Sequence, residues 1–206
     1  MTTLFVARHG QTDWNLEHRW QGHADPPLNE TGRMQAAELG EALAGSSVEA
    51  VFSSDLRRAA ETAEIAGARL GITVELDARL REVDVGEWSG LTSAEVEERY
   101  PQGYERRRAG MTGWTQGEEL AAMAARVVGT LLEIAARHPD GRVLVVTHGG
   151  PVRATLAACG LEPRTRPMVR NGDVDEILVR DGRMRWLHSI RGGLHQLVHP
   201  SSDDAG

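Results

Sequence analysis

The chain has 206 residues, a formal net charge of −7, 40% hydrophobic and 26% charged residues, a composition typical of one soluble globular domain with a full core. All 23 basic residues are arginine, which excludes chemistry that needs lysine, such as Walker-A phosphate binding or Schiff-base formation. The single cysteine, Cys159, excludes disulfide scaffolds and cysteine-ligated metal clusters, and the acidic balance argues against a nucleic-acid partner.

Short apolar runs alternate along the chain with segments of helical periodicity. Asn29 is placed to cap the helix after it, residues 92–95 (TSAE) form a capping box, and Gly71 stands where a helix-ending glycine belongs. In chain order we expect a strand at 3–7, a helix at 28–43, a strand at 48–52, a helix at 55–70, a strand at 72–76, helices at 92–100 and 118–138, a strand at 142–147, a helix at 151–159, and strands at 174–180 and 184–188.

This alternation predicts an α/β fold with a mostly parallel central sheet, helices on both faces and a C-terminal hairpin turning at Asp181-Gly182. We expect a single domain over residues 1–198. Segment 91–117 is predicted to act as a lid, and within it the Gly- and Arg-rich stretch 103–117 is expected to be a loop or lid without regular structure. Residues 199–206 are expected to be disordered.

The apolar runs are too short to span a bilayer, and residues 1–10 lack a basic segment followed by an apolar core. We therefore expect a cytoplasmic protein with neither a membrane partner nor a secretory signal. The terminal hairpin offers an exposed edge through which two copies could pair, so a homodimer stays open.

Two strands end in the same pattern of apolar residues followed by His and Gly, at 4–10 and 144–150. In open α/β sheets, ligands bind beyond the carboxyl ends of the strands. His9 and His148 are therefore expected to face one crevice although they lie far apart in sequence. Near His9, Gly10 is expected to let a ligand approach the backbone, and short polar or glycine residues follow as candidate binding groups: Thr12, Asn15, Gln21 and Gly22.

Two further candidates follow the second and third strands. Arg58 is expected in a first helical turn, where its fork geometry suits a phosphate, and Arg57 is taken as an ordinary surface residue. Glu82 precedes Trp88 and several glycines, which predict a tight, partly apolar wall that favours a proton donor, although Asp84 and Glu87 compete on sequence alone.

Together, these residues suit phosphoryl transfer without a cofactor. Arginines and a histidine neutralise the charge on the equatorial phosphoryl oxygens, a neutral imidazole attacks phosphorus, and a carboxylic acid protonates the leaving oxygen. A metal site built from His9, His148, Glu82 and Asp84 is the weaker alternative, because adjacent arginines would repel the cation and the short His spacing of metalloenzymes is missing.

Four motifs carry a resemblance to a known family: RHGQTDWN (8–15), SSDLRRAAETA (53–63), LREVDVGEWSG (80–90) and VTHGG (146–150). In this order they resemble the histidine phosphatase superfamily, in the branch of cofactor-dependent phosphoglycerate mutases and small phosphatases. The resemblance covers about residues 3–160 and implies a phosphoglycerate mutase-like fold.

The resemblance also implies roles for individual residues. His9 matches the phosphorylated nucleophile, Glu82 the acid/base, and Arg8, Arg58 and His148 the phosphate ligands. The residues that match the substrate pocket are Asn15, Thr12, Gln21 and Gly22, and Gly149 belongs to the matching VTHGG motif.

The departures from the family pattern favour a metal-independent phosphatase acting on a small phosphate ester. Thr12 stands where mutases tend to carry Ser, and the stretch from Glu82 to Gly117 is shorter than the mutase insertion that shields the phosphoenzyme. Glu119 replaces the Ser of the usual Pro-x-Gly-Glu-Ser segment, which puts substrate contacts there in question. A phosphoglycerate mutase and a non-catalytic binder of phosphorylated ligands are the alternatives.

Residues 106–108 (RRR) are either a solvated face or a second anion site for a carboxylate or phosphate on the substrate. Trp14, Trp20 and Trp114 are either wall and core residues or a surface for an organic ring.

Overall fold

The computed structural model describes residues 1–190, so the predicted tail at 199–206 lies outside the described residues. The strands of this part of the chain are β1 (Thr2–Arg8), β2 (Ala50–Ser53), β3 (Val74–Leu76), β4 (Arg142–Thr147), β5 (Val174–Arg180) and β6 (Arg183–Ile190). The helices are α1 (Asp13–Leu16), α2 (Glu30–Leu43), α3 (Arg57–Leu70), α4 (Ser93–Arg99), α5 (Pro101–Arg108), α6 (Leu120–Arg137) and α7 (Gly149–Ala158), with 3-10 turns η1 (Ala78–Leu80) and η2 (Gly86–Trp88).

The strands form one sheet in the order β3-β2-β4-β1-β5-β6. The pairs β3–β2, β2–β4 and β4–β1 are parallel, and β5 and β6 add an antiparallel hairpin at the β1 side. Asp181 and Gly182, at φ 51° and 71°, make the predicted tight turn. The predicted α/β class, mostly parallel sheet and C-terminal hairpin are confirmed. Pairing of two copies through the edge strand β6 stays a prediction.

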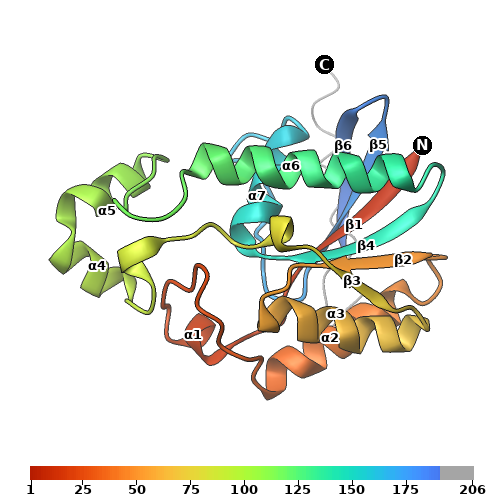
Figure 1. Cartoon of the computed structure of the whole chain (residues 1–206), viewed down its shortest axis with the longest axis horizontal. Coiled ribbons are helices and arrows are strands. Elements are labelled where there is room, and N and C mark those ends of the chain that lie inside the picture. Colours follow the sequence, from red (N-terminus) through yellow and green to blue (C-terminus); the bar gives the residue numbers. More distant parts are fainter. Residues whose placement is uncertain (191–206) are drawn as a thin grey trace.

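Helices cover both faces of the sheet, as predicted (Figure 1). Alternate side chains of β1 and β4 point to opposite faces, because successive residues of a strand do so. Leu4 and Val145 pack in the core beneath α6 and α7, whereas Phe5 and Leu144 pack in a second core beneath α2 and α3. Both strands are therefore buried on both faces, and their chemistry can emerge only at their ends.

Several helix boundaries follow directly from local signals. Asn29 caps α2 by accepting from the Gly32 amide, Thr92 and Glu95 form the predicted capping box of α4, and Gly71 ends α3 at φ 72°.

The expectation of an irregular stretch at 103–117 is wrong for its first part, because residues 101–108 form α5. Pro101 occupies the first turn, where its fixed φ favours a helix. Gly103 is required by close packing rather than by a loop, since a Cβ there would lie 2.3 Å from the Gly113 carbonyl oxygen. Helices α4 and α5 stand away from the sheet at one end of the molecule (Figure 1).

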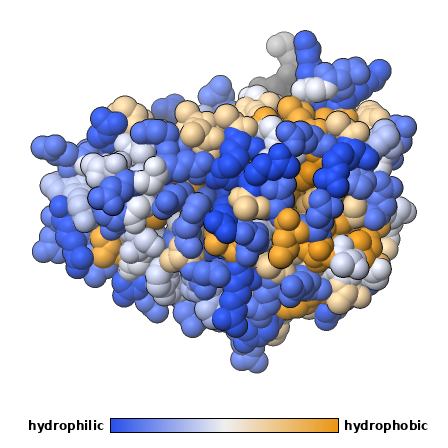
Figure 2. All heavy atoms as spheres, viewed as in Figure 1, coloured by the Kyte–Doolittle hydropathy of each residue, from blue (hydrophilic) through white to orange (hydrophobic). Residues whose placement is uncertain are grey.

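The surface in this view is mainly hydrophilic, with smaller apolar patches over the sheet end (Figure 2). Among residues 1–190, no helix has the length and apolar character needed to cross a membrane.

Candidate active site

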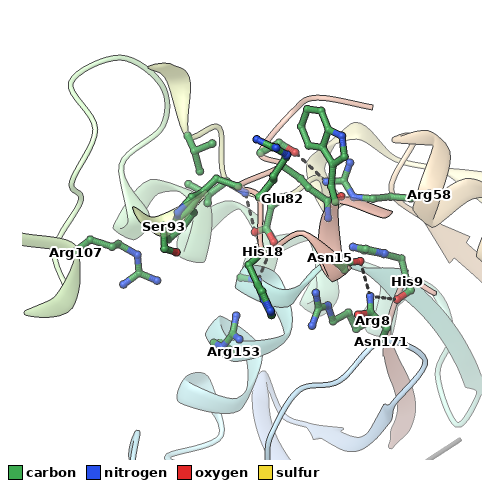
Figure 3. A pocket seen from close by; sticks show the side chains of 18 of the residues that line it. Arg8, His9, Asn15, His18, Arg58, Glu82, Ser93, Arg107, Arg153 and Asn171 are labelled. Atoms are coloured by element: carbon green, nitrogen blue, oxygen red, sulfur yellow. Dashed lines mark hydrogen bonds between the residues drawn. The ribbon is translucent and has the colours of Figure 1, made fainter. Parts of the chain in front are cut away.

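A cavity of about 690 Å³ opens where β1 and β4 end, and segment 91–117 contributes part of its wall (Figure 3). Of the predicted catalytic residues, Arg8, His9, Arg58 and Glu82 line it. The lining residues within the described part of the chain are Arg8, His9, Trp14, Asn15, His18, Arg19, Trp20, Gln21, Gly22, Arg58, Glu82, Val83, Val85, Ser93, Arg107, Trp114, Leu120, Gly150, Arg153 and Asn171.

The two predicted histidines meet because β1 and β4 are parallel neighbours. Arg8 pairs with Thr147 in the sheet register, so the next residue of each strand, His9 and His148, emerges at the same place. Their ring centroids lie 5.2 Å apart at an interplanar angle of 61°. The two rings therefore lie in edge-to-face contact, but His148 is fully buried and, among residues 1–190, does not line the cavity as His9 does.

The surroundings of His9 favour one tautomer of its neutral ring. Its Nδ1 lies 2.6 Å from the Gly10 carbonyl oxygen, and because a carbonyl only accepts, Nδ1 carries the proton and Nε2 keeps its lone pair. The ring is 3% exposed. Burial, followed by the positive charges of Arg58 and Arg8, holds the pKa of His9 well below its usual value.

His148 is completely buried, and its Nε2 lies 2.8 Å from the Ser54 hydroxyl. Its Nδ1 has no hydrogen-bond partner among residues 1–190. Burial, followed by the charges of Arg58, His9 and Arg8, also lowers the pKa of His148 well below its usual value. The Ser54 hydroxyl accepts from the Leu56 amide at 3.3 Å, so its own proton can point to Nε2, and the proton of the neutral ring then sits on Nδ1.

Arg58 is nearly buried and holds the loop before α2 by donating to the carbonyls of Gly22 and Ala24, at 2.9 and 2.7 Å. Burial lowers its pKa to about 10, an environment that favours a bound anion. Arg8 donates from Nη1 to the Val169 carbonyl at 3.1 Å, and burial likewise lowers its pKa.

Buried donors without a partner gather around this cavity. Buried polar groups are nearly always hydrogen-bonded, so each exception needs an explanation. Among the described residues, the Nε atoms of Arg8 and Arg58 and Nδ1 of His148 are such exceptions. All three belong to residues next to His9, an arrangement that suits the oxygens of one phosphoryl group.

Glu82 is the carboxylate that the fold places in the cavity. Its Oε1 accepts from the Val83 amide at 2.9 Å and its Oε2 from the Gly150 amide at 3.1 Å, so the helix after His148 fixes its position. The competitors are used elsewhere: Asp84 caps Gly86, and Glu87 binds residues 115–116.

The aromatic wall differs from the expectation. Trp88 is fully buried in the core instead of facing Glu82, and it packs edge-on against Trp20 and Trp114, at 5.3 and 5.5 Å between ring centroids. The latter two tryptophans line the cavity together with Trp14.

The predicted substrate-binding residues fall into two groups. Asn15, Gln21 and Gly22 line the cavity. Thr12 is fully buried and does not; its hydroxyl lies 3.1 Å from Asn15 Oδ1 and accepts from Gln21 Nε2 at 3.0 Å, so it positions those two side chains. Gly149 is also buried, at the start of α7.

The structure gives a different reason for glycine at position 10 from the expected approach of a ligand. A Cβ at Gly10 would lie 2.3 Å from the Gly32 carbonyl oxygen, so this glycine makes room for helix α2 rather than for a ligand. Its amide donates to the Thr62 hydroxyl at 3.0 Å. The glycine therefore fixes the backbone that orients His9.

Sequence reasoning missed several lining residues, among them Asn171 and Arg153. Asn171 Nδ2 donates to the carbonyl of His9 at 3.0 Å and to Asn15 Oδ1 at 3.1 Å. Arg153 lies four residues after Gly149 on α7, a helical spacing that could have linked it to the VTHGG motif.

The three arginines of α5, residues 106–108, lie in different surroundings. Arg107 lines the cavity, whereas Arg106 donates to the Thr112 carbonyl and Arg108 pairs with Glu105 at the surface. Within residues 1–190 there is no group of three or more His, Cys, Asp or Glu side chains that could hold a metal ion, so the proposed set of His9, His148, Glu82 and Asp84 is not assembled.

Comparison with known proteins gives a consistent result. The family model of the histidine phosphatase superfamily (branch 1) matches residues 4–190. A glucosyl-3-phosphoglycerate phosphatase of Mycobacterium tuberculosis (strain ATCC 25618 / H37Rv) is 39% identical over 165 residues, covering 75% of this chain and 74% of the relative. Phosphoglycerate mutase-like protein 4 of Arabidopsis thaliana is 34% identical over 199 residues, covering 94% and 86%. The structure of Bacillus stearothermophilus YhfR matches with a TM-score of 0.83 and 33% identity, covering 90% of this chain and 95% of that chain.

Proposed function

This chain belongs to the histidine phosphatase superfamily, and we propose that it hydrolyses a small phosphomonoester by passing the phosphoryl group through His9. Nε2 of neutral His9 attacks phosphorus and the bond from phosphorus to the ester oxygen breaks, while Glu82 gives its proton to the departing alcohol. The Glu82 carboxylate then takes a proton from a water molecule that attacks phosphorus and breaks the P–N bond. Phosphate leaves, and both side chains return to their starting states.

The observation that supports this proposal is the cluster of unpartnered buried donors around a neutral imidazole. Arg8, Arg58 and His148 each keep one such donor beside His9. Fixed donors of this kind stabilise the charge that develops on a transferring phosphoryl group, and they need no reorganisation during the reaction.

Hydrolysis is favoured over transfer within a phosphoglycerate. The relative from Mycobacterium tuberculosis is a phosphatase by name, and the family resemblance implies that the segment between Glu82 and Gly117 is shorter than the insertion that shields a mutase phosphoenzyme from water. The Arabidopsis relative carries a mutase-like name, so the two reactions need a direct comparison.

The test measures phosphate release from p-nitrophenyl phosphate in EDTA. His9→Ala should lower kcat by about 10³-fold or more. His138→Ala, a histidine that contacts Glu49 away from the cavity, should retain activity. Brief incubation with a ³²P-labelled ester should leave label on the wild-type protein that is stable to base and labile to acid.

Full activity in His9→Ala would refute the proposal. Isomerisation of 3-phosphoglycerate faster than phosphate release, in the presence of a bisphosphorylated primer, would assign a mutase. Thermal stabilisation by phosphate without turnover would assign a binding protein.

A further inference from the structure

The part of the cavity away from His9 carries a second group of positive side chains. Arg107 comes from α5 and Arg153 from α7. Figure 3 shows both guanidinium groups on the opposite side of the cavity from His9 and Arg58, with the His18 ring between the two groups.

Within residues 1–190, neither Arg107 nor Arg153 forms an ion pair. The Nε of Arg107 is buried without a hydrogen-bond partner, and its guanidinium group lies over the Trp20 ring. Burial, followed by the positive charge of Arg153, lowers the pKa of Arg107. The two guanidinium groups are therefore close enough to repel each other. Arg106 and Arg108 on the same helix are both engaged outside the cavity.

The second group of cations adjoins the phosphoryl site. A Cβ placed on Gly149 would lie 3.1 Å from Arg153 Nη1 and 3.6 Å from Arg8 Nε. Arg153 and Arg8 therefore pack on the same point of α7. An anion held by Arg153 can be only a few bonds from the phosphoryl group that Arg8 holds.

The net charge of the cavity lining also favours a second anionic group on the ligand. Considering residues 1–190, Arg8, Arg58, Arg107 and Arg153 line the cavity without a carboxylate in ion-pair contact, and Glu82 is the only acidic residue of this part of the chain among the lining side chains. A phosphomonoester dianion neutralises two of these four charges. The two remaining positive charges suit a further anionic group on the substrate.

We propose that Arg107 and Arg153 form a second anion subsite, which selects phosphomonoesters whose alcohol carries a carboxylate or a second phosphate a few bonds from the ester oxygen. This inference rests on the proposed function and adds the substrate class. The neighbouring His18 and Trp20 complete the wall of the subsite, and Arg107 lies over the Trp20 ring at 5.9 Å.

The test compares esters that differ only in the second group. 3-Phosphoglycerate and glycerol 1-phosphate share a three-carbon skeleton, with and without a carboxylate; propane-1,3-diol bisphosphate and propyl phosphate compare a second phosphate with none. The wild type should prefer the doubly anionic member of at least one pair by about tenfold or more in kcat/KM. Arg107→Gln and Arg153→Gln should each reduce this preference by about tenfold, mainly through KM, and Arg108→Gln should leave it unchanged.

Equal losses on the doubly and singly anionic esters, or no preference in the wild type, would overturn the subsite. Binding of the same pairs to His9→Ala protein, measured by calorimetry with and without Arg153→Gln, gives a second readout that needs no turnover. If no ester, p-nitrophenyl phosphate included, is hydrolysed, the proposed function fails. The binding preference then still decides whether the subsite exists.

Discussion

The two buried histidines should make the protein less stable as the pH falls below 6.5. Burial and the charges of Arg58 and Arg8 hold the pKa of His9 and of His148 well below the ordinary value of 6.5. Above pH 6.5 both rings are neutral in the folded and the unfolded chain. Below it, the unfolded chain binds protons that the folded chain does not, so acid favours unfolding.

The size of the effect follows from proton linkage. Each ring that is protonated only in the unfolded chain lowers the free energy of unfolding by about 1.4 kcal/mol per pH unit, so the pair lowers it by about 2.7 kcal/mol per pH unit. This loss continues until the pH reaches the lowered pKa values of the folded rings.

The measurement is urea unfolding between pH 7.5 and 5 in phosphate-free buffer, on the wild type and on the double variant His9→Gln/His148→Gln. All other titrating groups are common to both proteins, so the difference in unfolding free energy isolates the pair. That difference should be constant above pH 6.5 and should move in favour of the variant below it. A difference that stays flat down to pH 5 would refute the neutral-histidine geometry on which the mechanism depends.

Glu82→Gln should lower kcat by about 10²- to 10⁴-fold for alkyl esters and less for p-nitrophenyl phosphate, whose leaving group needs no proton; equal losses on both would argue against a proton donor. Ser54→Ala removes the partner of His148 Nε2 and should raise KM for esters by about tenfold, with recovery in Ser54→Thr; an unchanged KM would show that the hydroxyl does not orient the ring. Gly150→Ala would place a Cβ 2.2 Å from Glu82 Oε1, so it should lower kcat by about tenfold without loss of thermal stability. A Gly150→Ala enzyme with wild-type kcat would contradict the assigned position of Glu82. The control is Gly129→Ala in α6, where the added Cβ meets no atom of residues 1–190 within 4 Å; this variant should raise the free energy of unfolding by about 1 kcal/mol and leave kcat unchanged.

The sequence by itself determined the elements whose signals are local. Apolar runs, caps such as Asn29 and turn residues such as Asp181-Gly182 act within a few residues, so the strands, most helices and the hairpin could be predicted. The meeting of His9 and His148 was also predictable, because two parallel strands that end alike deliver their next residues to one edge of the sheet.

Only the tertiary structure decided which of several similar side chains faces the cavity. Glu82 is distinguished from Asp84 and Glu87 by an amide of α7, which lies far away in sequence. Arg107 is distinguished from its two neighbours by the direction in which α5 packs, with Gly103 of this helix against the Gly113 carbonyl.

The same limit applies to the glycines and to the polar residues behind the cavity. A side chain at position 10 would collide with helix α2, and the buried Thr12 hydroxyl forms hydrogen bonds with the side chains of Asn15 and Gln21. Contacts of this kind join segments that no local pattern relates, since packing and hydrogen bonding depend on three-dimensional neighbours rather than on spacing along the chain.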